Sequence, residues 1–325
     1  MDDITPLDPL LTPIHLRKHL IDAGWSDRGI SRALARGDLA KVRWGAYVTK
    51  AAYDALDEGG RNGLRARAVV AQAGTELVVS HVSALPFWGA PTWGFDLDAV
   101  HVTRRDRKAG RREAGVQQHR GRLLPGDTIS RGGVIVSSPT RLAIEVTTTG
   151  RTEAALCVVN DLLHRKLTTR EALEARYLAL DDGLDAPMDH WPGTLTANIV
   201  LRLCDAHLES VGESRLFHLC WVHGLPLPIP QYEVRDRHGR LIARVDFAWP
   251  ELGVFMEFDG KIKYTKLLKP GESITEVVLR EKRREQEVCE ATGWRGIRVD
   301  WPDLERAQAT AQRIAQVLAP PSLSA

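Results

Sequence analysis

The amino-acid sequence predicts a multidomain α/β protein, and three observations carry this prediction. The chain has 325 residues, enough for two or three domains at roughly 100–200 residues per domain. Hydrophobic residues make up 43% of the chain and charged residues 26%, as in a folded globular protein. Amphipathic segments of helical period alternate with short β-branched runs typical of strands. We expect four consecutive segments, at 1–55, 56–165, 166–194 and 195–325.

Segment 1–55 has the order of elements of a winged helix-turn-helix. Apolar residues at helical spacing over 14–21 predict a short helix that stops at Gly24. A second helix is expected between Ser26, a suitable N-cap, and Gly37, a suitable C-terminal glycine. Two short strands follow, on either side of 43–45. This order predicts a helix with a basic face followed by a basic hairpin.

The arginines of the second helix are the first candidates for DNA binding. Arg28, Arg32 and Arg36 recur every four residues and therefore share one face of the helix. A helix of this kind can enter the major groove, while Lys41 and Arg43 of the hairpin contact the backbone or the minor groove. The alternative is an αα-hairpin whose arginines are merely solvated.

A second basic stretch lies between residues 104 and 122, although the net charge of the chain is only +2. Its first cations are Arg104, Arg105, Arg107 and Lys108. Such a block either stays solvated or binds an anion, and nucleic acid is the commonest large anion in the cytoplasm.

Segment 56–165 is expected to be a small α/β module without a catalytic constellation. VHVT at 100–103 and VIVS at 134–137 have the composition of buried strands. Ser80 and Ser138 are suitable N-caps, and His81 and His101 are interpreted as lone structural histidines. In the connector 166–194, Thr168 is expected to cap a helix as part of a capping box.

Segment 195–325 contains the residues that point to chemistry. A helix closing at Gly224 is followed by three strands, joined by turns at 236–239 and 250–253. If these strands pair as antiparallel hairpins, Asp246 lies near Glu257 and Asp259 on one face. Three neighbouring carboxylates repel one another, and a divalent cation is the usual reason to tolerate them. Oxygen-only ligands predict Mg²⁺ or Mn²⁺.

Lys261 and Lys263 follow these acids directly and complete a candidate catalytic set. A lysine beside metal-binding carboxylates can orient a water or stabilise charge that develops on a phosphate oxygen. Glu213 is a further candidate metal ligand, or else the capping residue of its own helix, because Ser210-x-x-Glu213 spells a capping box. The alternative for the whole set is a solvated hairpin with charges on its exposed face.

Two family resemblances sharpen these expectations. GWSDRGISRALARGDLAKVRWGAYV resembles the winged-helix domain of AbiEi-family antitoxins of type IV toxin–antitoxin systems. The middle segment, with SHVSALPFWGAP, LDAVHVTR and VIVSSPTRLAIEV, is similar to the neighbouring region of those proteins. This resemblance implies an antitoxin or autorepressor that binds its own operator and has a cognate toxin or operon partner.

The C-terminal segment resembles very-short-patch-repair endonuclease domains of the PD-(D/E)xK superfamily over roughly residues 205–320. The shared pattern is Asp246, then Glu257-x-Asp259-Gly260, then Lys263. It implies a restriction-endonuclease-like mixed sheet flanked by helices, with Asp246 and either Glu257 or Asp259 as metal ligands. The chain departs from the strict triplet, which would need a lysine where it has Asp259, and Asp259-Gly260-Lys261 is an alternative triplet.

Two functions follow from these patterns. The first is a DNA-binding enzyme that cleaves phosphodiesters with Mg²⁺ or Mn²⁺, in bacterial phage defence or a toxin–antitoxin system. The second is a catalytically silent antitoxin and transcriptional autorepressor. Either function would involve binding of double-stranded DNA. The cytoplasm is the expected compartment, because the N-terminus lacks a basic, apolar leader and no apolar run is long enough for a membrane span. Four scattered cysteines indicate neither zinc nor disulfides.

Overall fold

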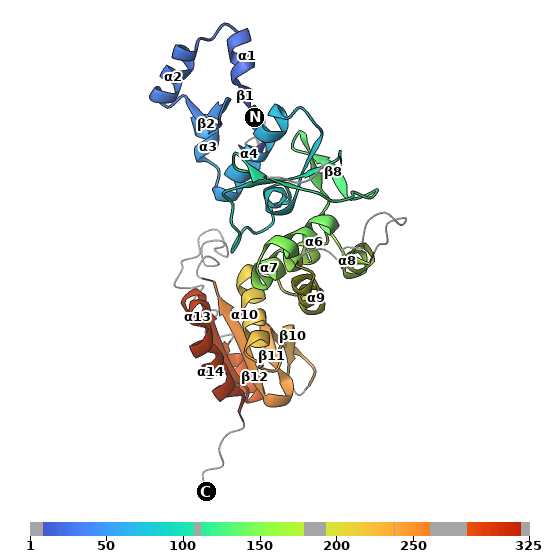
Figure 1. The fold of residues 1–325 in the computed structure, drawn as a ribbon. Coiled ribbons are helices and arrows are strands. Elements are labelled where there is room, and N and C mark those ends of the chain that lie inside the picture. Colours follow the sequence, from blue (N-terminus) through green and yellow to red (C-terminus); the bar gives the residue numbers. More distant parts are fainter. Residues whose placement is uncertain (1–8, 107–111, 179–192, 237, 261–284, 320–325) are drawn as a thin grey trace. The chain divides into compact units, whose positions relative to one another are not determined.

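The computed structural model describes residues 9–106, 112–178, 193–236, 238–260 and 285–319 (Figure 1). The chain divides into two compact units, unit 1 at Met1–Arg202 and unit 2 at Leu203–Ala325. Helices and three separate sheets occur in the described residues, which agrees with a multidomain α/β protein. In those residues no helix is both long and apolar enough to cross a membrane.

Unit 1 begins with a small module of short helices and a three-stranded sheet. Its elements are η1 (Pro9–Leu11), β1 (His15–Leu16), α1 (Arg17–Asp22), α2 (Asp27–Arg36), β2 (Leu39–Arg43), β3 (Ala46–Thr49) and α3 (Lys50–Asp54). The strand order is β1-β3-β2, and both pairs are antiparallel. We call residues 9–54 the N-terminal module.

The second helix of this module, α2, forms where the sequence predicts it, because its boundaries are set locally. The Ser26 hydroxyl accepts a hydrogen bond from the Gly29 N–H at 3.1 Å, as an N-cap does. Gly37 ends the helix in the left-handed conformation, with φ of +80°. Ile30 and Ala33 are buried against Leu20, Leu39 and Tyr47. The opposite face of α2 is therefore left to solvent.

The rest of unit 1 is built on a six-stranded mixed sheet of order β6-β7-β5-β4-β9-β8. The strands are β4 (Leu77–Val79), β5 (Val100–Arg104), β6 (Arg112–Glu113), β7 (Val116–His119), β8 (Thr128–Arg131) and β9 (Val134–Ser137). The helices are α4 (Glu58–Gln72), η2 (His81–Ala84), α5 (Leu85–Trp88), α6 (Pro139–Thr149), α7 (Thr152–His164), α8 (Arg170–Tyr177) and α9 (Thr194–Leu203). Strands β5 and β9 cover the two runs predicted to be buried strands.

A buried charge network holds α6 and α8 against this sheet. Arg141 and Glu145 are both almost fully buried, and the Arg141 Nε donates to Glu145 Oε1 at 2.8 Å. Asp127 accepts hydrogen bonds from Arg176 at 2.7 and 2.8 Å and from Arg141 at 3.3 Å. Each buried charge therefore has an opposite charge as partner, which is the condition for burying it.

The helix caps of this region differ in part from the predictions. Thr169, and not Thr168, caps α8, because its hydroxyl accepts from the Ala172 N–H at 3.2 Å. The Thr168 side chain is buried and forms a hydrogen bond with the Thr140 hydroxyl at 2.7 Å instead. Ser80 and Ser138 occupy N-cap positions, but neither side chain makes a capping hydrogen bond.

Unit 2 is a four-stranded mixed sheet of order β10-β11-β12-β13 with helices on both faces. Its elements are α10 (Val211–Val222), β10 (Ile229–Arg235), β11 (Leu241–Trp249), η4 (Pro250–Leu252), β12 (Val254–Asp259), β13 (Arg295–Asp300), α13 (Trp301–Glu305) and α14 (Ala307–Leu318). Strands β10 to β12 are antiparallel neighbours, and β13 runs parallel to β12. The predicted turns at 236–239 and 250–253 are present.

Aromatic contacts show which face of the β10–β13 sheet each helix covers. Phe247 stacks on Phe217 of α10 at 6.4 Å between ring centroids, and Phe258 meets Trp301 of α13 edge-on at 5.0 Å. Phe255 lies in a separate cluster with Val288 of the helical residues 285–292. Residues of β12 therefore alternate between the α10 face and the opposite face.

Gly212 lets the first turn of α10 lie directly on Phe258. A Cβ atom added to Gly212 would come within 2.0 Å of the Phe258 ring. We predict that Gly212→Ala lowers the stability of unit 2 by about 1–3 kcal/mol through overpacking, despite the better helix propensity of alanine. Urea denaturation of the full chain measures this change.

A second substitution separates this steric cause from other effects of Gly212→Ala. Phe258→Leu introduced together with Gly212→Ala shortens the clashing side chain and should recover part of the lost stability. An unchanged or increased stability of Gly212→Ala alone would contradict the packing described here.

Candidate functional site

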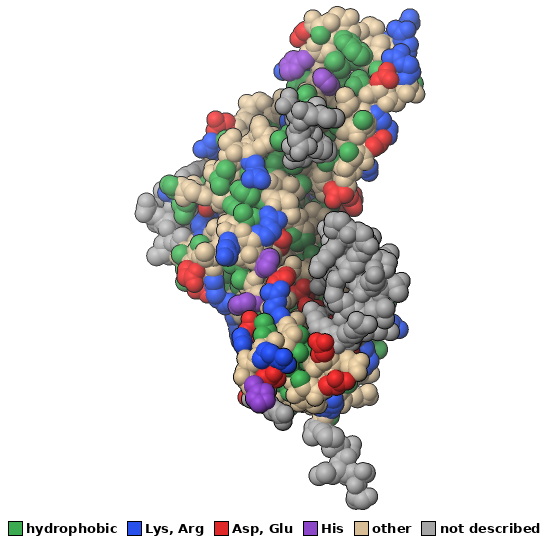
Figure 2. Space-filling model, turned by 180° about the vertical axis from the view of Figure 1, so that it is seen from behind, with side chains coloured by type: hydrophobic (Ala, Val, Ile, Leu, Met, Phe, Trp, Pro, Cys, Tyr) green, Lys and Arg blue, Asp and Glu red, His purple; other side chains and the backbone are tan. Residues whose placement is uncertain are grey.

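The exposed face of α2 carries positive charge that is only partly compensated among the described residues. Arg28, Arg32 and Arg36 are exposed, as their spacing predicts. Arg36 forms an ion pair with Asp38 at 2.7 Å. In the part of the chain that the structure describes, neither Arg28 nor Arg32 forms an ion pair. These two guanidinium groups are therefore available to a polyanion. Figure 2 shows Lys and Arg side chains along this edge of the module.

The hairpin of β2 and β3 adds a second basic element. Lys41 is exposed, and its Nζ lies 4.9 Å from the centre of the Trp44 ring. Arg43 is partly buried, and burial lowers the pKa of its guanidinium below the usual value. Trp44 at the tip is 82% exposed, which is unusual for so large an apolar side chain. No pattern in the sequence singled out Trp44, which lies in the turn between the two predicted strands.

The basic block at 104–122 begins, at the end of strand β5, with two arginines whose charges are compensated. Arg104 donates to Asp106 and to Gln118 Oε1, both at 2.8 Å. Arg105 forms an ion pair with Glu76 at 3.1 Å. Arg107 and Lys108 lie outside the described residues, so their predicted role in DNA binding stays a prediction.

In unit 2, Asp246 bridges the hairpin of β11 and β12. The last antiparallel pair of these strands is Phe247 with Met256. Continuing the same register by one residue places Asp246 opposite Glu257. There the Asp246 Oδ2 accepts a hydrogen bond from the backbone N–H of Phe258 at 2.8 Å. The carboxylate of Asp246 is thus held at the segment of β12 that carries Glu257 and Asp259, as alternation predicts.

The other two acids face Arg298 on the neighbouring strand β13. Its guanidinium lies 3.9 Å from Glu257 and 3.8 Å from Asp259, and it forms a closer ion pair with Glu285 at 2.8 Å. Glu257 and Asp259 therefore share one face of β12, and both have a cation beside them. No local pattern predicts this arginine, because Arg298 is about forty residues away from both acids in the chain.

Glu213 acts as a cap at the start of α10. Its N–H donates to the Ser210 hydroxyl at 3.1 Å, and the hydroxyl donates back to Glu213 Oε1 at 2.6 Å. Oε2 accepts from the Glu209 N–H at 3.0 Å and from Gln231 Nε2 at 2.9 Å. Both carboxylate oxygens are thus used within unit 2, which supports the capping role over that of a metal ligand.

The carboxylates of Asp246, Glu257 and Asp259 are of the chemical kind that binds a divalent cation, but in the described residues their arrangement does not form a metal site. Carboxylate oxygens are the ligands that Mg²⁺ prefers. However, Arg298 already lies beside two of the acids, and among the described residues no group of three or more His, Cys, Asp or Glu could hold a metal ion. Lys261 and Lys263 lie outside the described residues.

Three histidines form a cluster, although the sequence predicted that His81 and His101 are isolated: His81 belongs to η2, His101 to β5 and His119 to β7. His81 stacks on His119 of β7 with 3.6 Å between ring centroids, and His119 Nε2 lies 2.9 Å from His101 Nδ1 of β5. The parallel pairing of β5 and β7 brings the last two together. His81 is buried beside Ser80, whose hydroxyl is 2.9 Å from its Nδ1. No local sequence pattern predicts this clustering of histidines, because the clustering depends on the order of strands in the sheet.

Burial keeps all three imidazoles neutral near pH 7. It lowers the pKa of His101 to about 4, lowers that of His81 well below its usual value, and lowers that of His119. Neighbouring histidines and the Arg141 guanidinium further lower the pKa of His81. Asp96 and Arg112 act on His101 in opposite directions, and Glu145 opposes the lowering at His119. The cluster is therefore uncharged, with His81 buried and with His101 and His119 partly exposed.

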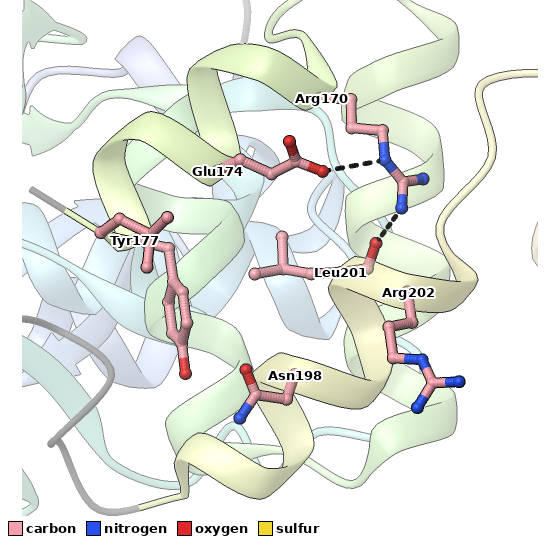
Figure 3. Close-up of a pocket in the computed structure, with 7 residues that line it drawn as sticks. Arg170, Glu174, Tyr177, Asn198, Leu201 and Arg202 are labelled. Atoms are coloured by element: carbon pink, nitrogen blue, oxygen red, sulfur yellow. Dashed lines mark hydrogen bonds and ion pairs between the residues drawn. The ribbon is translucent and has the colours of Figure 1, made fainter.

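A small pocket lies between α8 and α9 (Figure 3). It has a volume of about 330 Å³ and is bordered by an internal clamp, in which Arg170 donates to Glu174 at 3.1 Å and to the Leu201 carbonyl at 2.6 Å. The remaining lining residues are Tyr177, Leu178, Asn198 and Arg202. The bond from Arg170 to the Leu201 carbonyl ties α8 to α9, and the division between the two compact units falls near the end of α9, after Arg202.

The neutral histidines predict a stability that depends on pH. Their pKa values are lower in the folded than in the unfolded chain, so the unfolded chain binds more protons below about pH 6.5. Unit 1 should therefore be most stable above pH 6.5 and lose up to about 1.4 kcal/mol per pH unit per histidine as the pH falls toward 5. Chemical denaturation at several pH values measures this slope.

A matched pair of variants isolates the cluster. His101→Gln should flatten the slope, whereas His207→Gln, at an exposed position in unit 2, should keep the slope of the unmodified chain. Equal stability of the unmodified chain at pH 6.5 and pH 5 would contradict the neutral state of the three imidazoles.

Comparisons with known proteins add distant relatives only. No protein-family model matches this chain, and no solved structure matches it. Two uncharacterized proteins of Mycobacterium tuberculosis, one from strain CDC 1551 / Oshkosh and one from strain ATCC 25618 / H37Rv, are each 27% identical to it over 222 residues. The match covers 63% of this chain and 77% of each relative. The chain is similar to these proteins, and the likeness assigns no activity.

Proposed function

We propose that this chain binds double-stranded DNA through its N-terminal module. The observation that carries the proposal is the exposed face of α2, where Arg28 and Arg32 have no ion-pair partner among the described residues while Arg36 has one. An uncompensated basic face on a short helix is the electrostatic footprint of a nucleic-acid-binding surface.

The order of elements in the module supports a winged helix-turn-helix. Helices α1 and α2 are joined by a tight turn at 23–26, and the hairpin of β2 and β3 follows directly. Strand β1 joins the hairpin to give the order β1-β3-β2. In this arrangement α2 is the helix that enters the major groove, with its arginines toward bases and phosphates, and the hairpin reaches the neighbouring groove or backbone.

The basic block around β5 is a weaker part of the proposed DNA surface. Arg104 and Arg105 have acidic partners, so their positive charge is partly compensated where a phosphate would approach. Phosphate contacts from such residues add affinity that depends on salt but not on sequence. We assign the main contact to α2 and the hairpin.

Phosphodiester cleavage by unit 2 is the second candidate function. The observation that favours it is the hydrogen bond that holds Asp246 against β12, between the positions of Glu257 and Asp259. The placement of Asp246 on β11 and of Glu257 and Asp259 on the adjacent strand β12 resembles the order of acids in a PD-(D/E)xK nuclease. Arg298 beside two of them favours the alternative, in which unit 2 grips DNA or a partner without turnover.

The biological role of the chain depends on whether unit 2 cleaves DNA. A chain that binds operator DNA without cleaving it acts as an antitoxin or autorepressor, as its resemblance to AbiEi proteins implies, and its partner is a cognate toxin. A chain that also cleaves DNA acts as a defence nuclease. Both are cytoplasmic roles on duplex DNA.

The arginines of α2 provide the test of DNA binding. Arg32→Ala and Arg28→Ala should each weaken binding to a fluorescein-labelled duplex and reduce the slope of log K against log salt by about one unit. Arg36→Ala is the matched control on the same face, and it should change the slope less because Asp38 already neutralises Arg36. Fluorescence anisotropy at four salt concentrations measures the slopes. Equal slopes for all four proteins would remove α2 from the interface.

Plasmid nicking separates the two candidate functions of unit 2. If unit 2 is a nuclease, the full chain should nick supercoiled plasmid with Mg²⁺ or Mn²⁺, and Asp246→Asn should abolish nicking. Asparagine keeps an oxygen for the Phe258 N–H, so this variant preserves the hairpin while removing one negative charge. An intact plasmid together with retained DNA binding would reject the nuclease and support the silent module.

A further inference from the structure

The tip of the β2–β3 hairpin presents a large aromatic side chain that the N-terminal module does not need for its own core. Trp44 is 82% exposed, whereas the neighbouring residues Ala46 and Val48 are fully buried in the module. Leaving an indole in water gives up the burial that usually stabilises this side chain. An exposed apolar side chain of this size is typical of a binding surface.

The backbone carbonyls of Trp44 and of the following residue, Gly45, are both held by hydrogen bonds. The Trp44 carbonyl accepts from Gln72 Nε2 of α4 at 2.8 Å, and the Gly45 carbonyl accepts from the Arg17 N–H at 2.8 Å. Gly45 itself has φ of +71°, a conformation that favours glycine. The indole therefore projects from a fixed turn, so little further ordering is needed when it binds.

We infer that Trp44 enters the minor groove of the bound duplex and makes the N-terminal module prefer A·T-rich DNA. The inference rests on the proposed DNA binding. With α2 in the major groove, the hairpin of such a module lies over the adjacent minor groove or backbone. Proteins that bind the minor groove insert apolar side chains between base steps, and the indole has the flat apolar surface this requires.

Two physical effects give the preference for A·T pairs. Guanine places its N2 amino group on the floor of the minor groove, where it obstructs an entering ring, whereas A·T pairs present only acceptors there. Alternating A·T sequences contain TA steps, which unstack easily. Lys41, whose Nζ lies 4.9 Å from the Trp44 ring centre, brings a positive charge to a groove of negative potential.

The test compares two 24-base-pair duplexes, one of alternating A·T and one of alternating G·C sequence, by fluorescence anisotropy with the full chain. The unmodified chain should bind the A·T duplex about tenfold more tightly. Trp44→Ala should lose this preference, and Trp44→Phe should keep part of it. Trp221→Ala, which removes a partly exposed tryptophan from unit 2, should behave as the unmodified chain.

The possible results of this test distinguish the role of Trp44 from DNA binding itself. Equal binding of both duplexes by the unmodified chain, or an A·T preference that survives Trp44→Ala, would overturn the role of Trp44 and leave DNA binding intact. Failure of the unmodified chain to bind either duplex at low salt would overturn the proposed function together with this inference. Circular dichroism of Trp44→Ala checks that the module still folds.

Discussion

The packing of unit 1 depends on helix α4, because this helix contacts both of the sheets in the unit. Leu64 and Ala68 on one side complete the apolar core of the N-terminal module with β2 and β3. On the other side, the Asn62 amide donates to the carbonyls of Leu97 and Ala99 at 2.7 and 3.0 Å, next to β5. A single helix thus joins the small sheet to the large one.

The same helix sets the position of the proposed DNA surface. Through Gln72, α4 fixes the hairpin tip, and through Leu64 it fixes the sheet against which α1 and α2 pack. The hairpin and α2 therefore pack on one continuous framework that α4 supports. Groups that are already positioned before binding lose less conformational freedom when they bind.

Helix caps and the alternation of side chains along strands predicted much of the fold. The contacts that the sequence did not predict depend on the pairing of strands that are distant in the chain. The bounds of α2 follow from Ser26 and Gly37, which act within one turn of the helix. The approach of Asp246 to β12 follows from alternation along two adjacent strands. By contrast, the contact of His101 with His119 depends on strand order. Arg298 reaches β12 through a parallel pairing that no turn encodes.

Amide hydrogen exchange of the full chain, with and without duplex DNA, tests the central claim most directly. The account predicts that DNA slows exchange in peptides covering residues 26–36 and 39–49, and that high salt reverses this protection. Binding of DNA with unchanged exchange in both segments, and protection elsewhere in the chain instead, would contradict it.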